Sequence, residues 1–210
     1  RPLAEIKDNT PQDLVNDIEL LRTHLHIQDP IDIFAGSWGT TLALLYAETY
    51  PDHVSRMMLR GIFTCGWEAQ DYFYSEKGAA RFSPKAWEVF ISKIPAGPDR
   101  IQERLYRLLE NSDEKFKKRW RRIIAEYEYS FFNMPVADLE AALANTDSIH
   151  AEMRINTFYQ ANRFFLQDDQ ILNSANLIDH IPVPSFMAHA MLFARPSWLG
   201  GYIVCCPYQN

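Results

Sequence analysis

The sequence predicts an α/β protein in which a parallel sheet is interrupted by a large helical insertion. A short apolar run at residues 31–35 leads into a turn of small residues around a single serine, and a helix-forming run follows at residues 40–50. A second apolar run at residues 54–63 completes a strand–helix–strand unit, whose two strands must lie parallel. From residue 64 to residue 169 apolar residues recur at helical spacing, which indicates an all-helical region.

Four segments are therefore expected along the chain. Residues 1–63 form the first part of an α/β core, residues 64–169 form a helical cap, and residues 170–182 return to the core and its sheet. Residues 183–210 do not fit this pattern, because Pro184 interrupts a segment that should be a central strand.

The overall composition excludes several classes of partner. The formal net charge is −6, and the dense run of basic residues at 115–122 is interpreted as a solvated helix face, so nucleic acid and membrane surfaces are not expected partners. Cys65, Cys205 and Cys206 form neither a disulfide framework nor a zinc motif, which favours a reducing, cytoplasmic setting. No apolar run is long enough to span a membrane and no signal peptide is recognised. Because the chain opens on Arg1, we expect its N-terminus to be cut.

Individual elements follow from local signals. Thr10, Pro11 and Asp13 form a helix start, and this helix should run to about residue 26. Its apolar stripe consists of Leu14, Ile18, Leu21 and Leu25. The strand at residues 31–35 is almost wholly apolar, as expected for a strand covered on both faces. In the insertion, helices are predicted at residues 98–109, 113–129 and 136–160, and most of the aromatic residues are interpreted as core.

Ser37 is the candidate nucleophile. It lies between a predicted strand and a predicted helix, with the small residues Ala35 and Gly39 two positions away on either side, as in a nucleophile elbow. The alternative is an ordinary serine in a small-residue turn. A nucleophilic serine also needs a base, an acid and oxyanion donors, and the backbone N–H of Trp38 can supply one donor. No histidine of the chain has a convincing strand-end loop around it.

Three motifs are distinctive: Ala-Gly-Ser-Trp-Gly-Thr-Thr-Leu-Ala-Leu-Leu-Tyr-Ala at residues 35–47, Leu-Arg-Gly-Ile-Phe at 59–63 and Gly-Ala-Ala-Arg-Phe-Ser-Pro-Lys-Ala-Trp-Glu at 78–88. They resemble the proline iminopeptidases, which are serine peptidases of the α/β-hydrolase fold. The resemblance extends from Arg1 to about Pro182. It implies an α/β-hydrolase fold with an incomplete parallel sheet and an inserted all-helical cap, no cofactor, no metal, and peptides with an N-terminal proline as substrates.

The resemblance also assigns site residues. It makes Ser37 the nucleophile, places Arg60 and Phe63 in the pocket behind it, and puts Phe73 where the family has a pocket tyrosine. Glu128 falls on a glutamate that binds the free amine of the substrate, and a carboxylate suits this role because it pairs with an ammonium group. The alternative for Glu128 is a solvated helix face. A second amine-binding glutamate of the family falls near Asn156, and Ala35 replaces the first glycine of the elbow.

The tail after Pro182 departs from the family, which has a Val-His-Gly-x-x-Asp segment there. When Phe186-Met187-Ala188 is back-translated and read out of frame, it yields His or Tyr followed by Gly, so we interpret residues 183–210 as an out-of-frame ending. The triad aspartate and histidine are then absent from this chain, and the oxyanion loop of the family lies upstream of Arg1. We therefore expect an inactive fragment of a prolyl aminopeptidase. The alternatives are another hydrolase of this fold, such as an esterase or amidase, or a non-catalytic truncated product.

Overall fold

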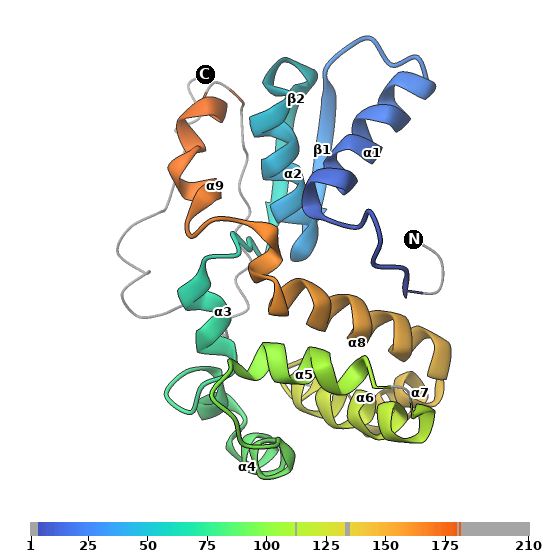
Figure 1. Cartoon of the computed structure of the whole chain (residues 1–210). Helices are drawn as coiled ribbons and strands as arrows, with labels where there is room; N and C mark the ends of the chain where they lie inside the picture. The colour runs from blue at the N-terminus through green and yellow to red at the C-terminus, as the bar shows by residue number, and fades with distance from the viewer. Residues whose placement is uncertain (1–3, 112, 133–134, 180, 182–210) are drawn as a thin grey trace. The chain divides into compact units, whose positions relative to one another are not determined.

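The computed structural model describes residues 4–111, 113–132, 135–179 and 181, and these residues form two compact units (Figure 1). The sheet unit contains the described residues of 10–67 and 166–181. The helical unit contains the described residues of 4–9 and 68–165. The predicted tail at residues 183–210 lies outside the described residues.

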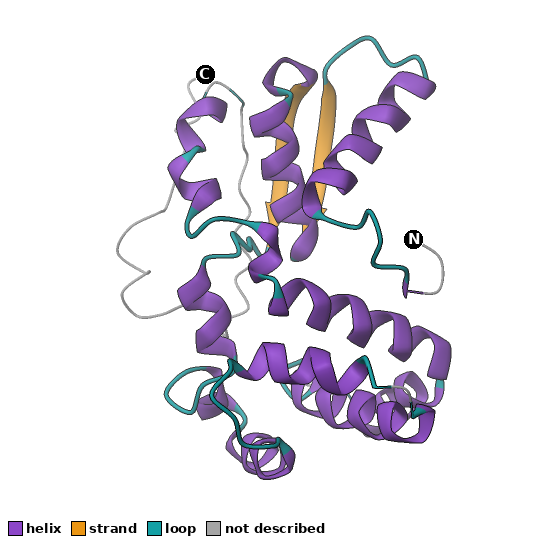
Figure 2. Ribbon diagram, viewed as in Figure 1, coloured by secondary structure: helices purple, strands orange, loops and turns teal. Residues whose placement is uncertain are grey.

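The sheet unit is built on a parallel pair of strands, as the strand–helix–strand pattern predicts. Strand β1 (Ile31–Gly36) pairs with β2 (Val54–Arg60), and the register runs from Ile31 opposite Val54 to Gly36 opposite Arg60. Helix α2 (Trp38–Thr49) connects them through the short 3₁₀ helix η2 (Pro51–His53) and packs against both strands (Figure 2). The described part of this unit therefore has a two-stranded sheet.

Helix α1 (Pro11–His24) precedes the sheet and begins as predicted. Thr10 and Asp13 form a capping box, in which the Thr10 hydroxyl accepts from the Asp13 N–H and the Asp13 carboxylate accepts from the Thr10 N–H. The predicted apolar stripe is only partly covered, because Leu14 and Ile18 are half-buried whereas Leu21 and Leu25 are exposed. Val15, which lies outside the predicted stripe, is buried. The stripe prediction was therefore wrong at its C-terminal end, where the described residues provide no cover.

The two faces of the sheet differ in burial. Ala35, Met57 and Leu59 are buried on one face, whereas Phe34 is 74% exposed and its partner Met58 is 41% exposed on the other. Side chains alternate between faces along a strand, so one whole face is uncovered in the described part of the chain. The prediction that β1 is covered on both faces is wrong for these residues.

The return to the sheet unit is helical within the described residues. Helix α9 (Gln170–Asn173) and the 3₁₀ helix η5 (Ala175–Ile178) both pack against α2. The expectation that this segment returns to the sheet is therefore corrected: up to residue 178 it covers the connecting helix instead.

The helical unit contains helices and no strand among its described residues, as the periodicity predicts (Figure 2). Its elements are α3 (Trp67–Phe73, whose first residue belongs to the sheet unit), η3 (Ala79–Phe82), α4 (Pro84–Lys93), α5 (Ile101–Leu109), α6 (Glu114–Tyr129), α7 (Val136–Ala144), α8 (Thr146–Ala161) and η4 (Arg163–Phe165). None of the described helices of the chain is long and apolar enough to cross a membrane.

Two details of the helical unit differ from expectation. The helix predicted over residues 136–160 is divided at Asn145, whose side chain accepts from the Ser148 N–H over 3.2 Å and so caps α8. Asparagine favours such caps because its side chain competes with the helical hydrogen bonds. The basic run at 115–122 is not uniformly solvated either, because Arg121 is buried and forms an ion pair with Glu114.

Aromatic side chains fill the core of the helical unit. The rings of Phe90 and Tyr127 stack with their centroids 4.3 Å apart, and Tyr74 and Phe131 also pack against Tyr127. The interpretation of the aromatic residues as core is thus confirmed for Tyr74 and Phe90, whereas Phe82 is exposed.

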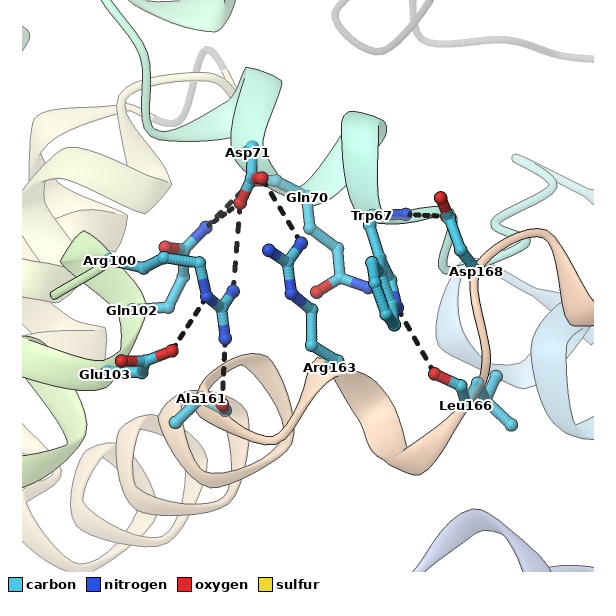
Figure 3. Close-up of polar contacts among 10 residues, drawn as sticks. All are labelled: Trp67, Gln70, Asp71, Arg100, Gln102, Glu103, Ala161, Arg163, Leu166 and Asp168. Carbon is cyan, nitrogen blue, oxygen red and sulfur yellow. Dashed lines mark hydrogen bonds and ion pairs between the residues drawn. The ribbon is translucent and has the colours of Figure 1, made fainter.

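Each unit has its own polar contacts at the segments that connect it to the other unit (Figure 3). In the sheet unit, Trp67 donates from its backbone N–H to Asp168 over 2.9 Å and from its indole N–H to the Leu166 carbonyl over 3.2 Å. In the helical unit, the Asp71 carboxylate pairs with Arg163 over 3.2 Å and with Arg100 over 3.8 Å.

Candidate active site

Ser37 occupies the sharp turn between β1 and α2. Its φ is 51° and its ψ is −126°, a backbone conformation that costs a residue with a side chain about 1–3 kcal/mol. The Ser37 N–H donates to the Arg60 carbonyl over 2.9 Å, so the end of the neighbouring strand holds the turn. The serine itself is exposed. This turn has the geometry of a nucleophile elbow.

The small residues around Ser37 allow the strand and the helix to pass closely. A Cβ atom placed on Gly39 would lie 3.7 Å from the Ala35 Cβ, and one placed on Gly36 would lie 3.3 Å from the Arg60 guanidinium. Alanine at position 35 is therefore compatible with the elbow, because even a Cβ atom on Gly39 would be at an ordinary van der Waals distance from its methyl group. The Arg60 side chain lies over Gly36 next to the serine.

Two threonines in the first turn of α2 tie the elbow to the loop after β2. The Thr40 hydroxyl donates to the Ser37 carbonyl over 2.7 Å and accepts from the Phe63 N–H over 2.9 Å. The Thr41 hydroxyl donates to the Phe63 carbonyl over 2.5 Å. Both threonines are fully buried. Phe63 is thus held against the elbow, where the resemblance places it, by two residues that the sequence reading did not single out. Arg60 is held there by the hydrogen bond from the Ser37 N–H to its carbonyl.

Trp38 is the first residue of α2. First-turn N–H groups have no acceptor within their own helix and carry the positive end of its dipole, which suits an oxyanion donor. In the described part of the chain no side chain hydrogen-bonds the Ser37 hydroxyl. His53, for example, lies 3.2 Å from a Glu19 oxygen and stacks on Tyr50.

Cys65 is not a competing nucleophile. It is buried beside Thr41, and burial raises the pKa of its thiol to about 12. The reactive form of cysteine is the thiolate, which is negligible at neutral pH when the pKa is this high. The described residues also contain no group of three or more His, Cys, Asp or Glu side chains that could hold a metal ion.

Glu128 forms a second cluster, in the helical unit. It lies on α6 and is only 7% exposed, which excludes the solvated-face alternative. The Tyr74 hydroxyl donates to Glu128 Oε1, and the Asn156 amide donates to Glu128 Oε2 over 2.7 Å. The structure therefore brings together Glu128 and Asn156, as the resemblance implies, and adds Tyr74, which the sequence reading missed.

Burial raises the pKa of Glu128 to about 7. The hydrogen bonds from Tyr74 and Asn156 and the nearby Gln160 amide oppose this rise in pKa, and the nearby charge of Glu152 adds to it. No lysine, arginine or histidine of the described part of the chain forms an ion pair with Glu128. A buried carboxylate without a cation is costly to ionise, so this site favours the arrival of a positively charged ligand.

Phe73 lies beside this cluster. Its ring meets Tyr74 edge-on at a centroid distance of 4.9 Å, and its carbonyl accepts from the Tyr127 hydroxyl over 2.9 Å. Of the predicted site residues, Ser37, Trp38, Arg60 and Phe63 gather in the sheet unit, and Phe73, Glu128 and Asn156 gather in the helical unit.

Comparisons with known proteins agree with this architecture. A family profile described as "alpha/beta hydrolase fold" matches residues 2–191. A probable proline iminopeptidase of Leptolyngbya boryana is 38% identical over 86% of this chain and 57% of its own length. Proline iminopeptidases of Arabidopsis thaliana and Xylella fastidiosa (strain Temecula1) are 35% and 36% identical over the whole of this chain and over 52% and 63% of their own lengths. The chain thus spans less than two thirds of these curated relatives.

The profile match covers most of the chain, and the relatives at this identity carry the same family name. The chain therefore belongs to the α/β-hydrolase fold family and is, within it, a relative of the proline iminopeptidases.

Proposed function

We propose that this chain carries the nucleophile and the amine-binding residues of a cytoplasmic serine aminopeptidase that releases N-terminal proline from peptides. The observation that carries this proposal is the buried Glu128 carboxylate, which has two hydrogen-bond donors and no ion-pair partner among the described residues. An enzyme that acts at a free N-terminus needs a group that recognises the ammonium, and a desolvated carboxylate binds an ammonium strongly.

The proposed reaction is acyl transfer. Ser37 attacks the carbonyl carbon of the N-terminal proline, and the Trp38 N–H stabilises the negative charge that develops on the carbonyl oxygen. The remaining peptide leaves as an amine, and water then releases proline from the acyl-enzyme. Proton transfer additionally requires a histidine and an acid.

The other site residues surround these groups within each unit. In the sheet unit, Arg60 and Phe63 lie next to the elbow. In the helical unit, Phe73 presents an apolar ring beside Tyr74 and Glu128. An apolar wall excludes water from the ammonium–carboxylate pair and thereby strengthens it. Nucleic acid and membranes are not proposed as partners, since the formal net charge of the chain is −6.

A binding experiment tests the amine-binding role of Glu128. Titration calorimetry at pH 7.5 compares L-prolinamide with N-acetyl-L-prolinamide, whose nitrogen is neutral. We expect only the cationic ligand to bind and Glu128→Gln to weaken binding at least about tenfold, because the variant loses an ion pair in a buried site.

Glu126→Gln is the matched control, since Glu126 lies on the same helix and pairs with Arg122 at the surface. Equal binding by the wild type and Glu128→Gln would overturn the assignment. An esterase or amidase of the same fold, which does not need Glu128, would bind neither ligand selectively and would favour an aryl ester over a proline arylamide.

A further inference from the structure

The glutamine at position 160 extends the Glu128 cluster by one residue along α8. The Gln160 Nε2 group donates to Asn156 Oδ1 over 2.9 Å, and Asn156 in turn donates to Glu128. The two amides therefore form a relay, a pair of consecutive hydrogen bonds that runs from Gln160 through Asn156 to the carboxylate. The Gln160 amide is also close enough to oppose the rise in the pKa of Glu128.

The relay leaves one acceptor unused. Gln160 Oε1 is buried, and no donor of the described part of the chain reaches it. The Glu128 carboxylate determines how the two side-chain amides are oriented, because an ionised carboxylate can only accept hydrogen bonds. Reversing Asn156 would turn its oxygen toward Glu128 Oε2 and its nitrogen toward Gln160 Nε2, so Gln160 would also have to be reversed to avoid a contact between two donors. With Glu128 ionised, the unused atom is the Gln160 oxygen.

A buried acceptor without a donor is unfavourable, and native structures seldom contain one without a reason. Here the atom belongs to the same cluster as a buried carboxylate that lacks a cation. A ligand that satisfies both groups needs a positive charge and at least two N–H bonds. An N-terminal proline has such a group, because its secondary ammonium carries two N–H bonds.

We propose that Gln160 Oε1 accepts the second N–H of the substrate ammonium while Glu128 accepts the first. This inference rests on the proposed function and makes Gln160 a determinant of specificity. The site would then select primary and secondary ammonium groups and discriminate against tertiary amines, which carry the same charge but offer a single N–H bond.

The test compares two ligands on the full chain. L-Prolinamide has two ammonium N–H bonds, and N-methyl-L-prolinamide has one and keeps the charge. We expect the wild type to bind L-prolinamide at least about tenfold more tightly, as for one hydrogen bond to a charged group. In Gln160→Met, which keeps the length of the side chain without the acceptor, the preference should fall to within about twofold.

The comparison separates a direct contact from an indirect one. If Gln160 only positions Asn156, Gln160→Met weakens both ligands equally and the preference persists, which overturns the inference. Gln167→Met, at an exposed glutamine of the sheet unit, is the control and should retain the preference. The wild type tests the inference without any variant, because equal affinity for the two ligands also overturns it. In both of these outcomes L-prolinamide still binds and the proposed function stands, whereas a wild type that binds neither ligand overturns both.

Discussion

Two glutamates in this protein have a pKa of about 7 because they are buried. Glu128 is surrounded by Tyr74, Tyr127, Asn156, Gln160 and, at longer range, Glu152. Glu48, on α2, has a buried Oε1 that accepts no hydrogen bond from the described residues. By contrast, a hydrogen bond from Arg22 lowers the pKa of Glu19 to about 2. The charge on Glu128 therefore depends on pH near neutrality, which matters for a group proposed to bind a cation.

This shift predicts a pH dependence of stability that Glu128→Gln should remove. A carboxyl whose pKa rises on folding stabilises the folded state fully below the unfolded pKa, and this contribution is lost as the pH rises to the folded pKa. For Glu128 the decline spans pH 4.5 to about 7 and amounts to about 3 kcal/mol. Urea unfolding at pH 5 and pH 8 should show the variant gaining stability relative to the wild type at the higher pH.

Glu126→Gln is again the control, since Glu126 lies at the surface and should not change the pH dependence in this interval by more than a few tenths of a kcal/mol. If Glu128→Gln follows the wild type at both pH values, Glu128 is not protonated in the folded protein near neutrality.

At the level of single elements, the first turn of α2 organises the nucleophile. The Thr40 hydroxyl hydrogen-bonds the Ser37 carbonyl and the Phe63 N–H, and the Thr41 hydroxyl hydrogen-bonds the Phe63 carbonyl. These bonds connect the start of the helix to Phe63. The strained conformation of Ser37 is thereby fixed by the strand end on one side and by the helix start on the other.

Thr40→Val tests this connection. The variant keeps the shape of the side chain but removes the acceptor of the Phe63 N–H and the donor to the Ser37 carbonyl. We expect a loss of about 1–3 kcal/mol in the free energy of unfolding, measured with urea. Thr49→Val on the same helix removes only a bond to the Leu45 carbonyl at an exposed position and should cost less than about 0.5 kcal/mol. Equal losses would contradict a special role for Thr40.

For the molecule as a whole, the described residues leave one face of the sheet uncovered. Phe34 and Met58 lie side by side on that face and are both exposed. Exposed apolar side chains on a two-stranded sheet promote association, so the chain should have low solubility.

Phe34→Ser should raise the concentration at which light scattering begins and reduce the binding of a hydrophobic dye, with stability changed by about 0.5 kcal/mol or less. Phe82→Ser, at an exposed phenylalanine of the helical unit, provides the comparison and should have the smaller effect. A wild type that remains monomeric at high concentration would contradict this prediction.

Catalytic turnover is a property of the whole molecule, because it requires groups from several segments of the chain. We expect the chain to release no proline from L-proline 4-nitroanilide above background, since a serine without its base and acid retains little activity. Proline release that Ser37→Ala abolishes would show that the chain contains a working triad. It would then refute the prediction that the aspartate and histidine are absent.

Local signals in the sequence were sufficient for the parallel strand pair, the capping of α1 and the all-helical insertion, because spacing, caps and small residues act over a few positions. The motif around Ser37 likewise implied a strained turn that the structure shows. Burial and long-range pairing were different. The exposure of Phe34, the split of the helix at Asn145 and the partners of Glu128 depend on which residues distant in the chain come together. Nothing near Glu128 in the sequence distinguishes a solvated carboxylate from a buried one. Tyr74 is 54 residues away, and Asn156 and Gln160 lie on another helix. The family resemblance therefore named Glu128 as a candidate amine-binding residue, but only the packing of the helical unit determined that this carboxylate is buried and which side chains hydrogen-bond it.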